Sequence, residues 1–494
     1  MIVSSTATVA DAPQRGFLGH PRGMSTLFFT EMWERFSYYG MRAILGYYLY
    51  TAVAEGGLGI PESTALSVVG VYGASVYMSS IFGGWVADRI TGAQWAVFAG
   101  GFVIMLGHIS LALPGGLATV IAGLVLLVLG TGLLKPNISG ILGSLYDEHD
   151  TRRDAGFSIF YMGINIGGFL APLICGWLGE KVNWHLGFGA AAVGMALGLI
   201  QYVIGKRTLG TAGLKPVNPL PEGHRGRVLA RAGAIAVLVV AAIAVPAVAG
   251  LLDLDGLVNV ISIVSAVLPV VYFAVMLSSK QITKIERDRL VAYIPLFLAT
   301  ALFFLLFEQQ PNTLANLAEA NTNLSVLGYE IPASWFQSIN SLAIIILAPL
   351  FAVMWMKLGE RQPSTPQKFV GGLLFVGLAF LWVVLSKTVV GEGNHMAIML
   401  ALVFVIMTIG ELLLSPVGLS ATTKLAPKVF ASQTLGLYFL APAMGQGLGA
   451  QVVKWYSVEN QQLYFGVVGL ATIGCAVLLA IGAKSIKKYM HGVN

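Results

Sequence analysis

Long apolar runs recur from one end of this 494-residue chain to the other, and they constrain its fold more than any other feature. Each run has about 20 residues or more, which is enough for a helix to cross the hydrocarbon core of a bilayer. Only 11% of the residues are charged, whereas soluble domains usually have about 25%. Because backbone amides inside a bilayer must be satisfied within their own segment, these runs predict helices. We therefore expect an all-α membrane protein that contacts the lipid bilayer on many sides.

The apolar pattern predicts about fourteen spans, with a seam in the middle of the chain. A basic stretch that contains Gly and Pro, Leu209 to Arg231, follows the first six spans. A pair of spans at about 228–250 and 257–280 comes next, and because it has almost nothing polar at depth we expect it to be peripheral. Removing the pair leaves six spans on either side, a layout typical of alternating access between two bundles. The spans are expected at roughly 24–53, 63–88, 93–113, 117–145, 153–180, 184–205, 228–250, 257–280, 290–315, 332–357, 368–388, 394–425, 430–456 and 463–483. The domain prediction is an N-terminal bundle over residues 1–205, a linker with the inserted pair over 206–289, and a C-terminal bundle over 290–494.

The basic residues are distributed very unevenly between the two sides of this map. With the N-terminus inside, about 23 of the 29 Lys and Arg residues fall on inner segments. The predicted outer loops carry only Lys181, Lys387 and Lys454. This asymmetry follows the positive-inside rule and predicts an even number of crossings with both termini cytoplasmic. Since the first residues lack a charged segment leading into a short apolar core, we expect no cleavable signal peptide.

One apolar run, Thr30 to Tyr50, carries charges that a lipid-facing helix would not tolerate. Glu31, Arg35, Tyr38 and Arg42 are spaced three or four residues apart, so they form one stripe on a helix. Glu34 lies beside that stripe. The stripe must therefore face protein or a water-filled cavity.

Three further ionisable side chains lie inside predicted spans. Lys135 precedes Pro136 near mid-depth, too far from the inner end for its side chain to reach the interface easily. Glu308 and Glu411 lie in the C-terminal half, opposite the cations of the N-terminal half. Buried charges need partners, and one carboxylate remains in excess, so a proton or a positively charged ligand group would neutralise it. A cavity with opposed charged poles suits a zwitterion.

Neutral polar side chains accompany these charges, although each also has a structural interpretation. Tyr161 and Asn165 share a helix face, and a hydrogen bond between packed helices explains them equally well. For Tyr72, aromatic packing is the simpler explanation. In the C-terminal half, Asn340 and Ser415 are polar side chains in the spans near Glu308 and Glu411.

Four motifs resemble those of known membrane transporters. Gly84-x-x-x-Asp88-Arg89 resembles the cytoplasmic loop signature of the major facilitator superfamily. The other three resemble the signatures of the proton-dependent oligopeptide transporter family within that superfamily, and together they cover both halves of the chain. They are Glu31-x-x-Glu34-Arg35-Phe36-x-Tyr38-Tyr39-Gly40, Phe160-Tyr161-x-x-Ile164-Asn165-x-Gly167, and Gly410-Glu411-Leu412 through Ser415-Pro416 with Thr422-Thr423-Lys424-Leu425-Ala426-Pro427.

The resemblance implies a major facilitator fold and a proton-coupled importer of di- and tripeptides in the cytoplasmic membrane. The residues that match the family's proton-coupling positions are Glu31, Glu34, Arg35 and Glu308, with Glu308 forming or breaking a bridge to Arg42. Those that match its peptide site are Arg35, Tyr38, Arg42, Tyr72, Lys135, Tyr161, Asn165, Asn340, Glu411 and Ser415. Protons would be the coupling ion, with no other cofactor, and a monomer would suffice for function.

Some features depart from the family pattern, and other functions remain open. Gly168-Phe169 replaces the more usual Ser/Ala-Leu, Tyr438 stands at a position where many relatives have tryptophan, and the second span lacks the histidine of some relatives. The same fold with nitrate, amino acids or another organic anion as ligand is the second hypothesis, and a membrane sensor or scaffold is the third. An enzyme is disfavoured because no nucleophile–base or metal constellation is visible. Neither a P-loop nor a nucleic-acid signature is present.

Overall fold

The structure, a computed structural model, describes residues 16–147, 150–221, 253–391 and 393–493, with scattered positions between 223 and 234. Among the described residues, eleven helices are long and apolar enough to cross a membrane. Two more are long enough as well: α1 (Gly23–Tyr50), which carries the charged stripe, and α15 (Ala431–Val452). The predicted span at 228–250 lies almost wholly outside the described residues. The prediction of a multi-pass helical fold is confirmed, and about fourteen spans are consistent with it.

The described chain forms two compact units. The first comprises residues 1–41, 79–175 and 185–253, and the second comprises 42–78, 176–184 and 254–494. Two long helices contribute to both units: α1, and α2 (Glu62–Val86). The predicted division at 205 and 290 is a different description of the chain, based on connectivity, and it stays a prediction.

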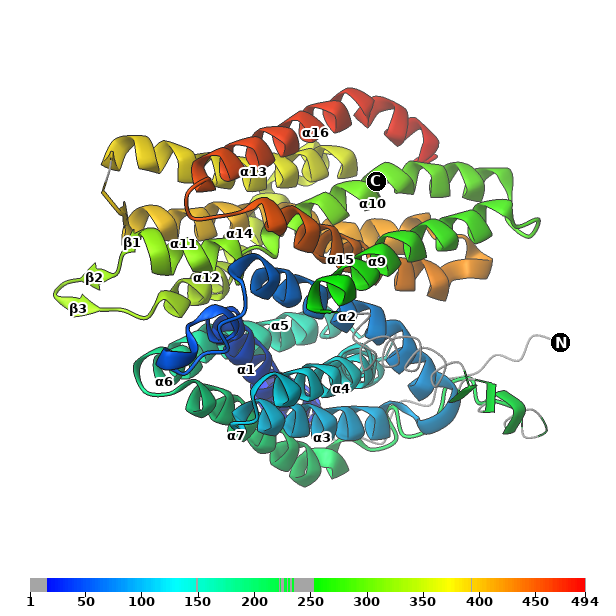
Figure 1. Cartoon of the computed structure of the whole chain (residues 1–494). Helices are drawn as coiled ribbons and strands as arrows, with labels where there is room; N and C mark the ends of the chain where they lie inside the picture. Colours follow the sequence, from blue (N-terminus) through cyan, green and yellow to red (C-terminus); the bar gives the residue numbers. More distant parts are fainter. Residues whose placement is uncertain are drawn as a thin grey trace. The chain divides into compact units, whose positions relative to one another are not determined.

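Small residues allow the helices of the first unit to approach closely. Figure 1 shows α3 (Ala93–Ala112) and α4 (Gly116–Ser144) side by side. A Cβ atom on Gly100 would lie 2.6 Å from the carbonyl oxygen of Gly130, so only glycine fits there. The unit is completed by α5 (Arg153–Ala171), which continues into a π-helical turn at Pro172–Gly176, and by α7 (Trp184–Gly205).

The Gly84 to Arg89 motif ends α2 in a π-helical turn, Ala87–Thr91. The backbone of this turn binds the linker, because the Asn218 amide donates to the Asp88 carbonyl at 3.0 Å. The Arg89 guanidinium donates to the Asn218 carbonyl at 3.4 Å. The motif therefore anchors the start of the mid-chain linker to the end of α2.

The second unit contains the remaining helices, several of which begin with clear capping signals. Thr283 and Glu286 form a reciprocal capping box at the start of α10, and Ser364 and Gln367 form another at the start of α13. Figure 1 shows α13 and α16 side by side. Besides α15 and the parts of α1 and α2, the described helices of this unit are α6 (Trp177–Lys181), α9 (Leu254–Ser278), α10 (Lys284–Phe307), α11 (Thr313–Asn321), α12 (Ser338–Leu358), α13 (Thr365–Val390), α14 (Ala397–Leu425) and α16 (Gln461–Tyr489).

The span predicted at 290–315 is not one continuous helix. It consists of α10, a turn at 308–312 and the short helix α11. Pro311 in the turn has no backbone N–H, so it removes one of the hydrogen bonds that would continue α10. The break therefore places Glu308 immediately after the last turn of α10.

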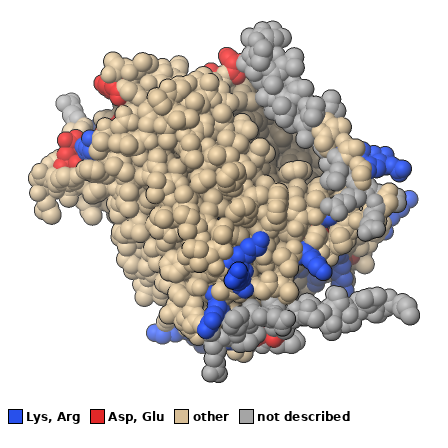
Figure 2. Space-filling view, turned by 90° about the horizontal axis from the view of Figure 1, so that it is seen from below, with Lys and Arg blue, Asp and Glu red and all other residues tan. Residues whose placement is uncertain are grey.

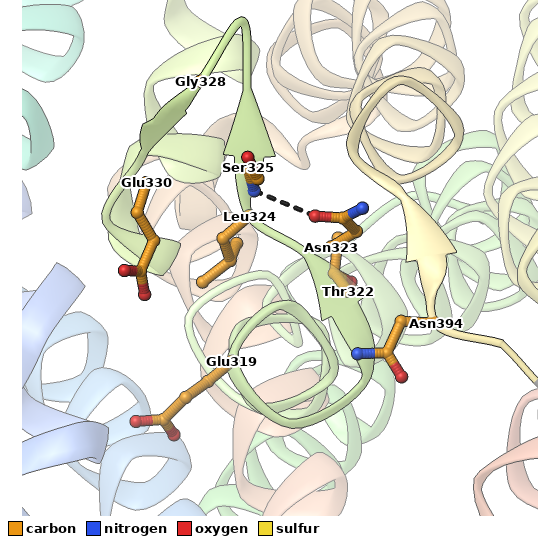
Figure 3. A pocket seen from close by; sticks show the side chains of 8 residues that line it. All are labelled: Glu319, Thr322, Asn323, Leu324, Ser325, Gly328, Glu330 and Asn394. Carbon is orange, nitrogen blue, oxygen red and sulfur yellow. Dashed lines mark hydrogen bonds between the residues drawn. The ribbon is translucent and has the colours of Figure 1, made fainter.

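Short strands and a surface hollow follow α11. Strand β1 (Thr322–Asn323) pairs in parallel with β4 (His395–Met396), and β2 (Ser325–Val326) pairs antiparallel with β3 (Tyr329–Glu330). Figure 3 shows the hollow, which has a volume of about 670 Å³. Its lining is mainly polar: Glu319, Thr322, Asn323, Leu324, Ser325, Gly328, Glu330 and Asn394.

One face of the molecule carries few charges. On the face shown in Figure 2, most of the described surface is formed by uncharged residues. Lys and Arg side chains gather toward the lower and right-hand parts of that view, whereas Asp and Glu lie mainly at the upper left. A broad uncharged face fits contact with hydrocarbon chains.

Candidate functional site

In the first unit, the charged stripe of α1 forms a buried ion cluster. The Arg35 Nε atom lies 3.0 Å from a carboxylate oxygen of Glu31 and 2.6 Å from one of Glu34. All three side chains are buried, with at most 4% exposed. The Arg35 guanidinium also lies 5.4 Å from the centre of the Tyr38 ring, a cation–π contact. One guanidinium therefore faces two carboxylates.

Glycines of α5 hold this part of α1 in place. A Cβ atom on Gly167 would lie 2.2 Å from the carbonyl oxygen of Met32, and one on Gly163 would lie 2.9 Å from the Phe28 ring. The two glycines are four residues apart, a spacing that lets membrane helices pack backbone to backbone. The second family motif thus supports the first through direct packing.

Lys135 of α4 acts on the same cluster, whereas Asn165 of α5 is bound within its own helix. Lys135 is close enough to Glu34 for an electrostatic interaction. The Asn165 side-chain amide donates to the Tyr161 backbone carbonyl at 2.9 Å, so the hydrogen bond lies within α5 rather than between helices. The neighbouring Asn137 of α4 donates to the Gly83 carbonyl of α2 at 3.2 Å, which ties these two helices together.

In the second unit, Arg42 pairs with Glu308. The guanidinium donates to a carboxylate oxygen, and the two side chains are 6% and 11% exposed. Since Glu308 follows the last turn of α10, its pairing with α1 depends on the break before α11. The predicted bridge between these two residues is present.

Glu411 of α14 is held by a neutral amide. The Asn340 side chain of α12 donates to Glu411 at 3.1 Å and to the Thr408 hydroxyl at 2.9 Å. Among the ion pairs of the described residues, none includes Glu411. One turn further, the Tyr438 hydroxyl donates to the Ser415 backbone carbonyl at 3.3 Å. The Asn340 amide therefore fixes the position of the Glu411 carboxylate, and none of the ion pairs named above gives it a cation.

A buried polar network beside Glu308 was missed by the sequence analysis. The Gln309 side-chain oxygen accepts from the hydroxyls of Thr313 and Tyr464, each at 2.8 Å. The Tyr456 hydroxyl donates to the Asn316 side chain at 2.9 Å. The run Gln309-Gln310-Pro311-Asn312 was the available signal, since so many amides in an apolar span require partners.

The second unit also joins the last part of α1 to helices from the other half of the chain. The Tyr47 hydroxyl donates to the Ala315 carbonyl at 2.9 Å, and the Gln337 side chain donates to the Ala43 carbonyl at 3.2 Å. The Tyr50 hydroxyl donates to the Glu319 carboxylate. Hydrogen bonds thus close this end of α1, the predicted outer end, against α11 and the residues before α12.

The predicted site residues fall into two groups. Within the first unit lie Glu31, Glu34, Arg35, Tyr38, Lys135, Tyr161 and Asn165; within the second lie Arg42, Tyr72, Glu308, Asn340, Glu411 and Ser415. Tyr72 is buried, with 4% of its surface exposed. That all of them line one chamber stays a prediction.

Comparisons with known proteins identify relatives along the whole chain. The sequence model described as POT family matches residues 94–471. The chain is 48% identical over 493 residues to an uncharacterized transporter, YclF, of Bacillus subtilis, covering 99% of each protein. It is 43% identical to a di-/tripeptide transporter of Lactococcus lactis subsp. cremoris, covering 97% of this chain and 99% of that protein.

The fold is also close to a solved structure. The crystal structure of a peptide transporter POT in complex with sulfate has 51% sequence identity and a TM-score of 0.95, and the match covers 98% of this chain and 99% of that one. The predictions of the fold class and of a transporter rather than an enzyme are confirmed by these relatives. The chain belongs to the POT family.

Proposed function

We propose that this protein is a proton-coupled symporter that imports di- and tripeptides across the cytoplasmic membrane by alternating access. Both termini would lie in the cytoplasm, a monomer would suffice, and protons would be the coupling ion without any other cofactor. The observation that carries the proposal is the state of Glu411, a positioned carboxylate whose partner is an amide. Such a group can receive the ammonium group of a substrate.

Peptides fit this arrangement because they are zwitterions. The α-ammonium group would bind Glu411, while the carboxylate would bind the cationic residues Arg35, Arg42 and Lys135. The names of the Lactococcus relative and of the solved structure support peptides as the substrate class. Nitrate or another inorganic anion would leave Glu411 without a role.

Proton coupling follows from carboxylates that share too few cations. Glu31 and Glu34 both face Arg35, so one of them can take up a proton when the cluster rearranges. In the other unit, a substrate carboxylate that approaches Arg42 competes with Glu308 for the guanidinium. Displacing Glu308 removes the charge that favours its ionised form, and proton uptake becomes easier.

Proton-driven uptake into liposomes tests the proposal. We expect labelled dialanine to accumulate under an inward proton gradient, and more so when the interior is negative, since each charge gains about 2.3 kcal/mol per 100 mV. Glu34→Gln should abolish gradient-driven accumulation but retain exchange of peptide for peptide. Uptake that persists unchanged after the gradient is collapsed would refute proton coupling.

Competition for binding separates the substrate classes. Unlabelled dipeptides and tripeptides should displace the labelled dipeptide, whereas nitrate and single amino acids should not. If nitrate competes at concentrations where dipeptides do not, the anion hypothesis replaces the peptide hypothesis.

A further inference from the structure

The helix α9 of the inserted pair makes both apolar and polar contacts within the second unit. Gly447 of α15 lies so close to α9 that an added Cβ atom would be 2.0 Å from the Ser265 hydroxyl oxygen. The apolar side chains of Val258 in α9, Val71 in α2 and Ala450 in α15 pack into one buried cluster. The sequence pattern indicated almost nothing polar at depth in this helix, yet Ser262 and Ser265 are buried; its peripheral position stays a prediction.

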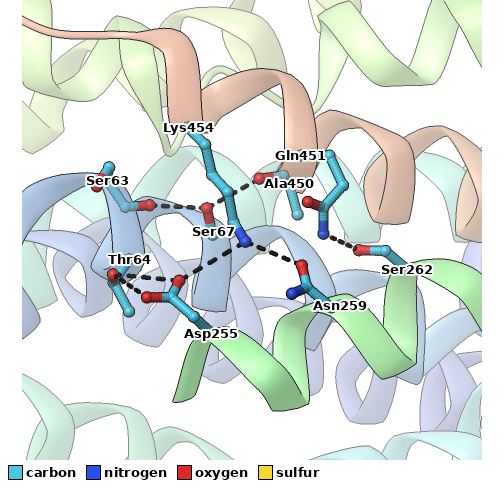
Figure 4. Close-up of polar contacts among 9 residues, drawn as sticks. All are labelled: Ser63, Thr64, Ser67, Asp255, Asn259, Ser262, Ala450, Gln451 and Lys454. Atoms are coloured by element: carbon cyan, nitrogen blue, oxygen red, sulfur yellow. Dashed lines mark hydrogen bonds and ion pairs between the residues drawn. The ribbon is translucent and has the colours of Figure 1, made fainter. Parts of the chain in front are cut away.

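Polar side chains connect α9 and α15 along matching stripes, as Figure 4 shows. The Gln451 side chain donates to the Ser262 hydroxyl at 3.0 Å. The Lys454 ammonium donates to Asn259 at 3.0 Å and lies 3.7 Å from Asp255. The residues that make these contacts are three or four positions apart on both sides, so one face of α9 lies along one face of α15 and the residues that follow it.

The same region also holds the beginning of α2. The Thr64 hydroxyl lies 3.3 and 3.2 Å from the two carboxylate oxygens of Asp255, to which it donates. The Ser67 hydroxyl donates to the Ala450 carbonyl at 2.8 Å. A Cβ atom on Gly70 would lie 3.1 Å from the Cβ atom of Ala450, so α2 and α15 are in direct backbone-level contact.

Asp255 is the polar group that connects all three elements. Its carboxylate accepts from Thr64 of α2 and pairs with Lys454, which follows α15. Alternating access requires the predicted outer end of α2 to separate from α15, because they belong to opposite halves of the chain. The stripe of contacts between α9 and α15 need not break in that step, whereas the Asp255–Thr64 contact must.

We propose that Asp255 is a gating residue: α9 acts as a clasp, fixed to α15, that holds the outer end of α2 in the closed position. Lys454 is a positioning residue, which orients the carboxylate toward Thr64. Helix α9 would thereby set how often the transporter opens to the outside. This inference rests on the proposed alternating-access function, but its central contact can be tested without transport.

Distance measurements on the full-length protein test the clasp directly. Spin labels are attached through Pro61→Cys, just before α2, and Glu459→Cys, after α15, in a background carrying Cys175→Ala and Cys475→Ala, in lipid nanodiscs. With Asp255 intact we expect one predominant short distance. Asp255→Asn and Thr64→Val should each increase the long-distance population severalfold, and the double variant should add nothing to either single change.

The matched control is Glu360→Gln, which removes an exposed carboxylate from the turn after α12. It should leave the distance distribution unchanged, and Asp255→Glu should restore most of the short distance. High salt should increase the long-distance population of the unmodified protein but not that of Asp255→Asn, since the Lys454 and Asp255 side chains are 26% and 50% exposed and their attraction is screened.

Distances that are the same with and without Asp255, or that respond equally to Glu360→Gln, would overturn the clasp. The peptide-uptake assay tests the transport proposal independently of these distances. If uptake fails while Asp255→Asn still lengthens the distance, the transport proposal fails and the clasp stands as a conformational contact.

Discussion

Single side chains differ in how directly the sequence predicts their contacts. The Arg35 pair with Glu31 is four residues apart on one helix, so helical periodicity alone predicts it, and it is present. The Arg42 pair with Glu308 joins residues far apart in sequence, and only the family resemblance indicated it. The Asn340 contacts with Glu411 and Thr408 were missed, because no local rule relates α12 to α14.

The neutral partner of Glu411 leads to a prediction about affinity. Glu411→Gln keeps the size of the side chain and its ability to accept from Asn340, but it removes the charge that would bind an ammonium group. A hydrogen bond to a charged group contributes about 1.5–3 kcal/mol, so dipeptide binding should weaken roughly ten- to a hundredfold. Isothermal titration calorimetry on the purified transporter measures this change.

The exposed carboxylate Glu459 provides the matched control. Glu459→Gln removes the same charge from the loop after α15 and should leave dipeptide affinity within twofold of the unmodified protein. Equal effects of the two substitutions would mean that Glu411 acts only through net charge.

At the level of whole helices, the apolar pattern of the sequence predicts some features of the fold and misses others. The apolar runs predicted most helix positions within a few residues, as for α1, because hydrocarbon thickness and backbone hydrogen bonding leave few alternatives. They did not predict the break between α10 and α11, since a proline alone also occurs inside unbroken helices such as α4 and α14. Nor did they predict the contacts of α9, whose serines lie against Gly447 and Gln451 of α15.

The packing of α5 on α1 leads to a prediction about stability. Gly167→Ala would place a methyl group 2.2 Å from the Met32 carbonyl oxygen, so the helices must move apart near the Glu31–Arg35 cluster. Overpacking of this kind costs about 1–3 kcal/mol, and a lower melting temperature should accompany reduced peptide uptake. Scanning fluorimetry in detergent, beside the uptake assay, measures both effects.

Gly189→Ala in α7 serves as the comparison, because nothing lies within 4 Å of its added Cβ atom. Its melting temperature should be unchanged or slightly higher, since alanine is the better helix former. If both substitutions lower the melting temperature equally, close packing on α1 is not the reason for Gly167.

At the scale of the whole molecule, the distribution of basic residues predicts an orientation. About 23 of the 29 Lys and Arg residues fall on the predicted inner segments, so both termini should be cytoplasmic. Green fluorescent protein fused after Asn494 should fluoresce, and alkaline phosphatase fused there should be inactive. Alkaline phosphatase fused after Glu459 should be active, and the opposite pattern would invert the proposed topology.

The hollow beside β1 and β2 leads to a prediction about pH. The pKa of Glu319 is raised, mainly because its carboxyl group is partly withdrawn from water, even though the residue lines a surface hollow. The negative charges of Glu180, Glu62 and Glu55 raise the pKa further. A raised pKa favours the protonated form in the folded protein. The contribution of Glu319 to folding stability is therefore complete below the unfolded pKa of about 4.3. This contribution is lost as the pH rises through the pKa that Glu319 has in the folded protein.

Glu319→Gln should accordingly raise the melting temperature at pH 8, by about 1 °C, and leave it nearly unchanged at pH 4.5. Tyr50→Phe removes the hydroxyl that donates to this carboxylate, so stability should decline more steeply with rising pH. Thermal unfolding across this pH range measures both variants. An effect of Glu319→Gln that is equal at both pH values would contradict the assigned cause.

The close approach of Gly447 to Ser265 has a consequence for how such chains diverge. A residue larger than glycine at this position would require the Ser265 side chain to rotate and α9 to give way slightly, so the presence of α9 restricts what α15 can carry there. In a homologous chain without the insertion, the same position would border lipid and could vary. Substitution rates at this one site should therefore distinguish lineages that carry the additional helices from those that do not.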